Sequence, residues 1–305
     1  MTISFNSAVP LLEEPSLTFR RTAEGLGIEA SRTTILAELG SLTLEFTRLS
    51  QLTNDSKYFD AIQRITDQME AAQLKTKVPG LWPVMVNAEE MKFTDPRFTV
   101  GGMADSMYEY LPKEHMLLGA QVNQYKNMYD SAMDAIKDRL IFRGMTKDNQ
   151  EVLFAGNVQA GMPRKEDLEH EAEHLKCFLG GMVGIGAKVF KRSAEELRIA
   201  RGLTDGCIWA YDSMPTGIMP EIFHVSACDD MDDCKWDEKK WYRDVQLRLS
   251  KGTRAQDAQK EGKALVKTHA LAPGITDVSD ARYFLRYVAS PSRQLRLALN
   301  KPNIY

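Results

Sequence analysis

The segment ILAELGSLTLEFTRLSQLTNDSKYFDAIQRITDQMEAA, residues 35–72, decides the fold class. Its apolar residues recur at alternating steps of about three and four, which is the spacing of an amphipathic helix. The two stripes consist of Ile35, Leu39, Leu42, Phe46 and Leu49, then Tyr58, Ile62, Ile65, Met69 and Ala72. Between the stripes, Asp55 or Ser56 can serve as an N-cap. The segment therefore predicts two consecutive helices.

Three more apolar stripes with helical spacing follow along the chain. They run through Leu118, Val122, Tyr125, Tyr129, Ala132, Ile136 and Leu140, then Leu168, Ala172, Leu175, Leu179 and Met182, then Ala200, Leu203, Cys207 and Ala210. Before the last stripe, Ser193 and Glu196 have the spacing of a capping box. Strand-like alternation is confined to short pieces at 81–86 and 97–100. We therefore expect a mostly α protein with helices in sequential pairs, as in a helical solenoid or toroid.

The composition is that of an ordinary globular protein. The chain has 305 residues and a net charge of −3, with 43% hydrophobic and 27% charged residues. It carries no basic surplus, so we expect no nucleic-acid partner. No apolar run approaches 18 residues, so we expect no transmembrane helix. Residues 1–21 lack the pattern of a signal peptide, which taken literally predicts a cytosolic protein.

The four cysteines are too few for a disulfide scaffold and leave two bridges or four thiols as open alternatives. Cys228 and Cys234 bracket the acidic run DDMDD. Such a run can hold a hard cation through carboxylate oxygens. A solvated acidic loop, in which the carboxylates repel one another, is the favoured interpretation.

The sequence HEAEH at 170–174 has the spacing of a zinc-hydrolase motif. On a helix, His170 and His174 would share one face and bind zinc, with Glu171 as the general base. The extension found in metzincins fails, because Cys177 stands where that pattern has glycine. A zinc hydrolase is therefore kept as an alternative to a charged helix face that contains two histidines.

Carboxylates on apolar segments are a stronger indication of function. Glu38 and Glu45 are seven residues apart, hence on one face of an otherwise apolar predicted helix. Asp105 lies in a segment rich in Met and Tyr, and Glu221 has apolar neighbours. A single carboxylate of this kind is normally an ion-paired structural residue. Several of them with aromatic residues nearby indicate an acidic, aromatic cleft of the type that binds and cleaves sugars.

Four segments, in order, resemble motifs of the class I α-1,2-mannosidases, glycoside hydrolase family 47. ILAELGSLTLEFTRLSQLTNDSKY is similar to the family's A-E-x-G-[ST]-L-x-L-E-F and L-S-x-L-T-G-D-x-K-[YF]. FTVGGMADSMYEYLPK is similar to G-[AG]-x-x-D-S-x-Y-E-Y-L-x-K, and HLKCFLGGMVGIGAK to H-L-x-C-F-x-G-[GT]. CIWAYDSMPTGIMPEIF is similar to the block that ends T-G-x-x-P-E. Together the motifs cover roughly residues 10–225.

The resemblance implies a fold and an activity. It implies a mostly α fold, a partial (αα)7 barrel or helical toroid with about four of seven helix pairs present. Residues 1–286 would be an incomplete catalytic domain, and residues 287–305 a non-homologous C-terminal tail. The implied activity removes α-1,2-linked mannose from N-glycans with inversion, with Ca2+ as cofactor. The implied partner is a high-mannose N-linked oligosaccharide or glycoprotein, and we expect a monomer.

The resemblance also implies roles for five residues of this sequence. Asp105 and Glu221 match carboxylates of the active site and are the expected catalytic residues. Glu38, Glu45 and His174 match residues of the sugar-binding cleft and are expected to bind substrate.

Further matches concern the compartment. Cys177 and Cys207 match the pair that forms the family's disulfide, and Met103 matches a position that is apolar in the Golgi type. The resemblance therefore implies the secretory pathway, in the ER or Golgi lumen behind a membrane anchor, or secretion. This differs from the cytosolic location predicted from residues 1–21 alone.

The sequence also departs from the family pattern. It contains no F-E-[TV]-x-I-R motif, and after ARYFLR it reads YVA at 287–289 where the catalytic base motif has P-E-x. The family's calcium-binding threonine is absent too, so no direct metal ligand is expected in this chain. We therefore expect a domain truncated at both ends, with poor stability and little hydrolase activity. The alternative function is a catalytically dead mannose-glycan-binding or quality-control module.

Overall fold

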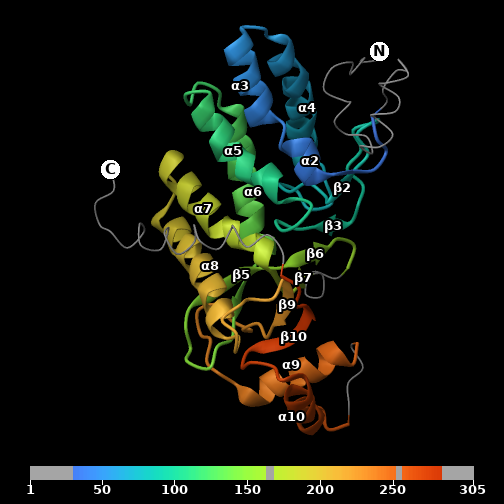
Figure 1. Ribbon diagram of the computed structural model, residues 1–305, viewed down its shortest axis with the longest axis vertical. Coiled ribbons are helices and arrows are strands. Elements are labelled where there is room, and N and C mark those ends of the chain that lie inside the picture. Colours follow the sequence, from blue (N-terminus) through green and yellow to red (C-terminus); the bar gives the residue numbers. More distant parts are fainter. Residues whose placement is uncertain (1–29, 163–167, 252–255, 284–305) are drawn as a thin grey trace. The chain divides into compact units, whose positions relative to one another are not determined.

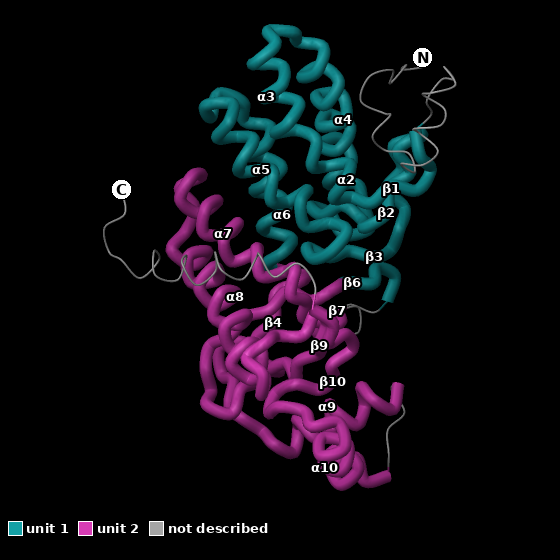
Figure 2. The backbone as a smooth tube through the Cα atoms, in the orientation of Figure 1, with its two compact units in different colours: residues 1–137, 158–167 teal, residues 138–157, 168–305 magenta. Residues whose placement is uncertain are grey.

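The computed structural model describes residues 30–162, 168–251 and 256–283, and the chain divides into two compact units (Figure 2). Unit 1 comprises residues 1–137 and 158–167, and unit 2 comprises residues 138–157 and 168–305. The predicted tail, residues 287–305, lies outside the described residues, so its separation from the catalytic domain stays a prediction. Within the described ranges, no helix is both long and apolar enough to cross a membrane.

Unit 1 consists mainly of helices with two short antiparallel strand pairs (Figure 1). Its elements are β1 (Thr34–Ile35), α2 (Leu36–Gly40), α3 (Thr43–Thr53), α4 (Lys57–Gln73), β2 (Met85–Val86), β3 (Arg97–Phe98), α5 (Asp105–Leu117), most of α6 (Gln124–Arg139) and most of β6 (Asn157–Gln159). Strand β1 pairs with β2, and β3 pairs with β6. The two extended pieces predicted at 81–86 and 97–100 contain β2 and β3.

The second predicted helix of the opening segment is confirmed, and the first is divided in two. On α4, Ile62, Ile65 and Met69 are at most 4% exposed, as the apolar stripe predicts. The predicted helix over 35–49 is instead α2 and α3, with a break after Gly40. A Cβ on Gly40 would lie 2.2 Å from Met107 Sδ and 2.9 Å from Met107 Cα. The break therefore occurs where α2 packs closely on α5. The helical spacing of apolar residues does not reveal this contact.

Unit 2 combines helices with antiparallel strands. Its elements are β4 (Ile141–Gly144), β5 (Val152–Ala155), β7 (Leu168–Glu169), β8 (Glu171–Glu173), the 3-10 helix η2 (His174–Cys177), α7 (Phe178–Val189), α8 (Ala194–Asp212), β9 (Ile222–Val225), α9 (Glu238–Leu249), α10 (Ala258–His269) and β10 (Ile275–Asp280). Strand β4 pairs with β5, and β9 lies between β8 and β10. The sequence therefore underestimated the strand content of this unit.

The helix predicted over 168–182 is wrong in its first half. Strand β8 pairs with β9, with Ala172 opposite Phe223, and both residues are at most 2% exposed. A short strand with one buried residue between two glutamates carries too few positions to be told from a helix by spacing. Because β8 is extended, His170 and His174 do not share a helix face, and the predicted zinc-hydrolase motif is not formed.

The predicted capping box at the start of α8 is also wrong. Ser193 is the N-cap residue, but its side chain makes no capping hydrogen bond. The carboxylate of Glu196 instead accepts a hydrogen bond from Arg192 Nε at 2.7 Å. A buried glutamate, 1% exposed, gains more from a charged partner than from a backbone amide.

Helices α9 and α10 cross at a glycine. The stretch 250–275 is polar and weakly patterned in the sequence, yet it contains α10, whose one buried residue is Gly262. A Cβ at Gly262 would lie 1.8 Å from the carbonyl oxygen of Tyr242 on α9. The absence of a side chain is therefore what allows α10 to approach the backbone of α9.

We predict that Gly262→Ala destabilises unit 2. An exposed helical Gly→Ala change gains up to about 1 kcal/mol of helix propensity. Here the clash with a backbone carbonyl should outweigh that gain and cost a net 1–3 kcal/mol or so. Urea unfolding followed by tryptophan fluorescence measures the change, and Trp241, which is 4% exposed on α9, contributes to this signal. Lys263→Ala, at an exposed position of α10, is the control. If the Gly262→Ala protein were as stable as this control, Gly262 would not lie against the Tyr242 carbonyl as described.

Candidate active site

The ladder between β8 and β9 brings His174 and Glu221 together. Glu173 pairs with Ile222 in this ladder. The next residue along, His174, donates a hydrogen bond of 2.8 Å from its backbone N to the carbonyl oxygen of Glu221. The side chains meet as well, with His174 Nδ1 4.0 Å from Glu221 Oε2. Two predicted site residues that are 47 positions apart in the sequence are thus neighbours in unit 2.

A disulfide joins the segment that contains His174 to α8. Cys177 and Cys207 are bonded, with their Cα atoms 5.9 Å apart, so η2 is joined to α8. This is the pair that the resemblance implies. One turn beyond Cys207 on α8, the Tyr211 hydroxyl lies 2.8 Å from His174 Nε2. Tyr211 was missed in the sequence, although its spacing of four from Cys207 places it on the same helix face.

The three side chains form a largely buried polar group. The side chain of His174 is 0% exposed and that of Glu221 is 9% exposed. A buried carboxylate is costly unless hydrogen bonds or charges satisfy it. The residues around Glu221 restrict the orientation of its carboxylate, which keeps slight access to solvent. Such a group can hold a proton or a hydroxyl group in a defined position.

Asp105 is the first residue of α5 in unit 1. The turn before it contains Met103 in the left-handed region, at φ 72°, and Asp105 N donates to Gly101 O at 2.8 Å. Backbone strain of this kind is common where a functional side chain must be positioned. Asp105 Oδ1 accepts a hydrogen bond of 2.8 Å from Ser106 N. Burial, assisted by the negative charge of Glu109, raises the pKa of Asp105 above its ordinary value.

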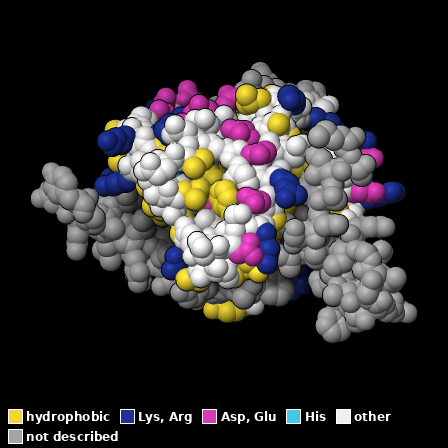
Figure 3. Space-filling view, turned by 90° about the horizontal axis from the view of Figure 1, so that it is seen from above, with side chains coloured by type: hydrophobic (Ala, Val, Ile, Leu, Met, Phe, Trp, Pro, Cys, Tyr) yellow, Lys and Arg dark blue, Asp and Glu magenta, His cyan; other side chains and the backbone are white. Residues whose placement is uncertain are grey.

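Glu38 and Glu45 lie on different helices, contrary to the prediction that they share one helix face. Glu38 is on α2 and Glu45 is on α3, and both are exposed. Tyr110 on α5 donates a hydrogen bond of 2.9 Å to Glu45 Oε1. Burial and this hydrogen bond raise the pKa of Tyr110 to about 12. Seen from above α3 and α4, the surface carries hydrophobic side chains with acidic side chains near them (Figure 3).

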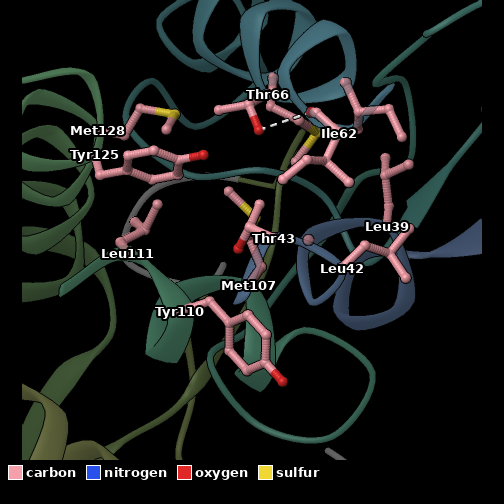
Figure 4. Close-up of a pocket in the computed structure, with 13 residues that line it drawn as sticks. Leu39, Leu42, Thr43, Ile62, Thr66, Met107, Tyr110, Leu111, Tyr125 and Met128 are labelled. Carbon is pink, nitrogen blue, oxygen red and sulfur yellow. Dashed lines mark hydrogen bonds between the residues drawn. The ribbon is translucent and has the colours of Figure 1, made fainter. Parts of the chain in front are cut away.

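Unit 1 also contains a small interior cavity between α2, α4, α5 and α6 (Figure 4). Figure 4 shows the Tyr125 hydroxyl pointing toward Thr66, and the Tyr110 hydroxyl pointing away from the other labelled residues. The cavity holds about 20 Å³, which is room for about one water molecule. It is too small for a sugar, so it is not a substrate site.

A buried carboxylate on α5 also escaped the sequence analysis. Glu114 is 0% exposed, and its Oε1 accepts a hydrogen bond of 2.6 Å from the Thr47 hydroxyl. Its spacing of three from the buried Leu111 was the available signal. Burial raises the pKa of Glu114.

The predicted site carboxylates do not form a calcium site in the described residues. Among these, the group of three or more metal-ligating side chains is Glu169, Glu171 and His224. It includes none of the predicted catalytic or sugar-binding residues. Ca2+ prefers oxygen ligands alone, whereas this group includes an imidazole nitrogen, so it does not fit the implied ion.

Comparisons with known proteins agree with the motifs. The family model of glycosyl hydrolase family 47 matches residues 5–287. The chain is 29% identical over 206 residues to mannosyl-oligosaccharide alpha-1,2-mannosidase IA of Drosophila melanogaster, covering 67% of this chain and 29% of that protein. It is 33% identical over 192 residues to the endoplasmic reticulum mannosyl-oligosaccharide 1,2-alpha-mannosidase of Mus musculus, covering 63% and 28%. The chain therefore spans less than a third of the length of these two relatives.

A solved structure agrees with the fold. The alpha-1,2-mannosidase from Trichoderma reesei is similar with a TM-score of 0.58 at 21% identity, covering 85% of this chain and 57% of that one. The likeness confirms the predicted fold class, mostly α and part of an (αα)7 barrel. With the family match across residues 5–287, it also confirms the resemblance seen in the motifs. The chain belongs to glycosyl hydrolase family 47.

Proposed function

We propose that this chain has the function of a mannosyl-oligosaccharide 1,2-α-mannosidase, a glycosidase that acts on α-1,2-linked mannose of N-glycans. The observation that carries the proposal is the buried pair of His174 and Glu221, which lies inside the family match. The names of the relatives from Drosophila melanogaster and Mus musculus support the same substrate class.

Asp105 and Glu221 are the proposed catalytic carboxylates. Inverting hydrolysis uses one carboxylic acid to protonate the glycosidic oxygen and one carboxylate to activate water on the opposite face of the sugar. Burial raises the pKa of Asp105, which suits a carboxyl group that must carry a proton to the leaving oxygen. Glu221, which is 7% exposed, has the restricted orientation that a reacting carboxylate requires.

The remaining predicted residues, Glu38, Glu45 and His174, are proposed to support sugar binding. His174, whose side chain is 0% exposed, does so by orienting Glu221, while the Tyr211 hydroxyl holds His174 Nε2. On unit 1, the hydrogen-bonded pair of Glu45 and Tyr110 presents a carboxylate beside an aromatic ring, and Glu38 is an exposed carboxylate. Carboxylates next to aromatic rings are suited to sugars, which have polar edges and apolar faces.

The disulfides support a location in the secretory pathway. The bonds Cys177–Cys207 and Cys228–Cys234 use all four cysteines of the chain. Disulfides persist in oxidising compartments and are rare in the cytosol. We therefore favour the lumen of the secretory pathway or secretion over the cytosolic location predicted from residues 1–21.

The second candidate is a mannose-glycan-binding module without turnover. It is favoured by the residues after ARYFLR, where this sequence reads YVA at 287–289 in place of the P-E-x of the catalytic base motif. The two candidates differ in whether bound glycan is cleaved. Assays of binding and of free mannose in the same solution therefore separate them.

We predict that Glu221→Gln weakens the binding of α-1,2-mannobiose by about tenfold or more. The neutral amide loses a hydrogen bond to a charged group, which is worth about 1.5–3 kcal/mol. Isothermal titration calorimetry measures the change, and Glu261→Gln, at an exposed position of α10, is the matched control. We expect the unmodified chain to bind the disaccharide. Release of free mannose then supports the mannosidase, and binding without release supports the second candidate. Equal binding by both variants would remove Glu221 from the proposed site.

We predict that Asp105→Asn stabilises the protein more at pH 7 than at pH 4. Burial raises the pKa of Asp105 in the folded state above its ordinary 3.8, so its stabilising contribution is complete below 3.8 and is lost as pH rises through the folded pKa. Asparagine keeps an oxygen that can accept from Ser106 N and carries no charge to bury. Urea unfolding at both pH values measures the difference.

The control for this prediction is Asp134→Asn, because Asp134 has an exposed side chain on α6 with a weak ion pair to Lys137. Its effect should differ little between the two pH values. A gain for Asp105→Asn that shrinks as the pH rises would mean that the folded protein favours the charged form of Asp105.

A further inference from the structure

We infer that unit 2 binds a divalent transition-metal cation of the zinc class through Glu169 on β7, Glu171 on β8 and His224 on β9. One ligand atom from each of these residues lies within 4.8 Å of the other two. This donor set is distinct from the HEAEH motif, although it uses the same Glu171. It is also separate from the proposed catalytic carboxylates Asp105 and Glu221.

The spacing of the donor atoms is close to that of a zinc site. His224 Nε2 lies 3.2 Å from Glu169 Oε1 and 3.5 Å from Glu171 Oε2. Zn–N and Zn–O bonds of about 2.0–2.2 Å in a tetrahedral arrangement separate the donors by roughly 3.4 Å. The three side chains therefore need only small movements to surround one ion.

The other ring nitrogen of His224 has the partner that a metal-binding histidine requires. His224 Nδ1 lies 3.3 Å from the Ser279 hydroxyl on β10, and this hydroxyl donates to Asp277 Oδ2 at 2.8 Å. A metal-ligating histidine almost always engages its second nitrogen in this way, which fixes the ring and its tautomer. Because His224 is 3% exposed, its ring is held with Nε2 toward the two glutamates.

The three donor atoms are of the kinds that zinc binds. His224 Nε2 faces carboxylate oxygens of both Glu169 and Glu171. Imidazole nitrogen and carboxylate oxygen are both zinc ligands, so one ion between these atoms would contact all three groups.

The surrounding charges leave room for a divalent ion. Three carboxylates, those of Glu169, Glu171 and Asp277, lie within 4.0 Å of the His224 ring nitrogens. Arg248 forms ion pairs with Glu169 at 2.8 Å and with Asp277 at 3.5 Å, and so offsets one of the three negative charges. The buried Lys176 also lies near, because its Nζ donates to the Glu171 carbonyl oxygen at 3.1 Å. A cation would offset the negative charge that remains.

The chemistry of the donors favours zinc over calcium, and the site has an entry path. A hard ion such as Ca2+ prefers oxygen ligands alone, whereas imidazole suits Zn2+. Glu169 and His224 line an open cavity of about 380 Å³, from which water can supply a fourth ligand. With its ligands on β7, β8 and β9, the ion would join three strands and stabilise unit 2.

The test is zinc binding by the full chain after removal of metals with EDTA, without thiol reductants. Titration with ZnCl2 in a calorimeter should give one zinc per chain, and zinc should raise the temperature of thermal unfolding. His224→Gln should weaken binding by about 100-fold or more, because it removes a direct ligand. Ser279→Ala should weaken it by about tenfold, as loss of a supporting hydrogen bond does. His269→Gln, at the exposed end of α10, is the control.

Circular dichroism checks that each variant folds, and Glu171→Gln replaces His224→Gln if the latter does not. The absorption spectrum of bound Co2+ provides a second readout, with visible bands that weaken in the ligand variants and persist in His269→Gln. The inference is overturned if the unmodified chain binds no zinc, if the ligand variants bind zinc as well as the control, or if Ca2+ binds at this site in preference to Zn2+.

Discussion

The disulfide between Cys177 and Cys207 is the constraint on which the candidate site in unit 2 depends. His174 lies three residues before one cysteine, and Tyr211 lies four residues after the other, so the bond holds both partners of their hydrogen bond. The cysteines are 30 residues apart, and closing a loop of that length is worth about 3–4 kcal/mol. The β8–β9 ladder then sets Glu221 against His174. One covalent bond and one strand pairing thus assemble three polar side chains.

The two proposed catalytic carboxylates are on different units. Glu221 of unit 2 is buried beside a histidine and a tyrosine, and Asp105 of unit 1 follows a turn with Met103 in the left-handed region. The family match spans residues 5–287, whereas the chain covers 57% of the Trichoderma reesei structure. Family membership and fold follow directly from these matches. The activity on α-1,2-linked mannose is a proposal that rests on the polar groups described above.

Much of the helical framework was predictable from the sequence, because α4 and α8 each bury one continuous stripe of apolar residues. The break after Gly40 could not be predicted in this way, because it depends on contact with Met107, 67 positions away. Strand β8 was mistaken for a helix because pairing with β9 involves residues about 50 positions distant. The motifs pointed to Asp105, Glu221 and His174 individually as candidate site residues. Their partners, such as Tyr211, depend on folding that brings distant segments together.

The proposal that this chain recognises α-1,2-linked mannose is tested most directly by comparing its binding to two mannose disaccharides with different linkages. Saturation-transfer NMR on the unmodified chain would compare α-1,2-mannobiose with α-1,6-mannobiose, two isomers of the same size and polarity. We expect at least a tenfold preference for the α-1,2 isomer, equivalent to about 1.4 kcal/mol. Equal binding of the two isomers, or no binding of either, would contradict it.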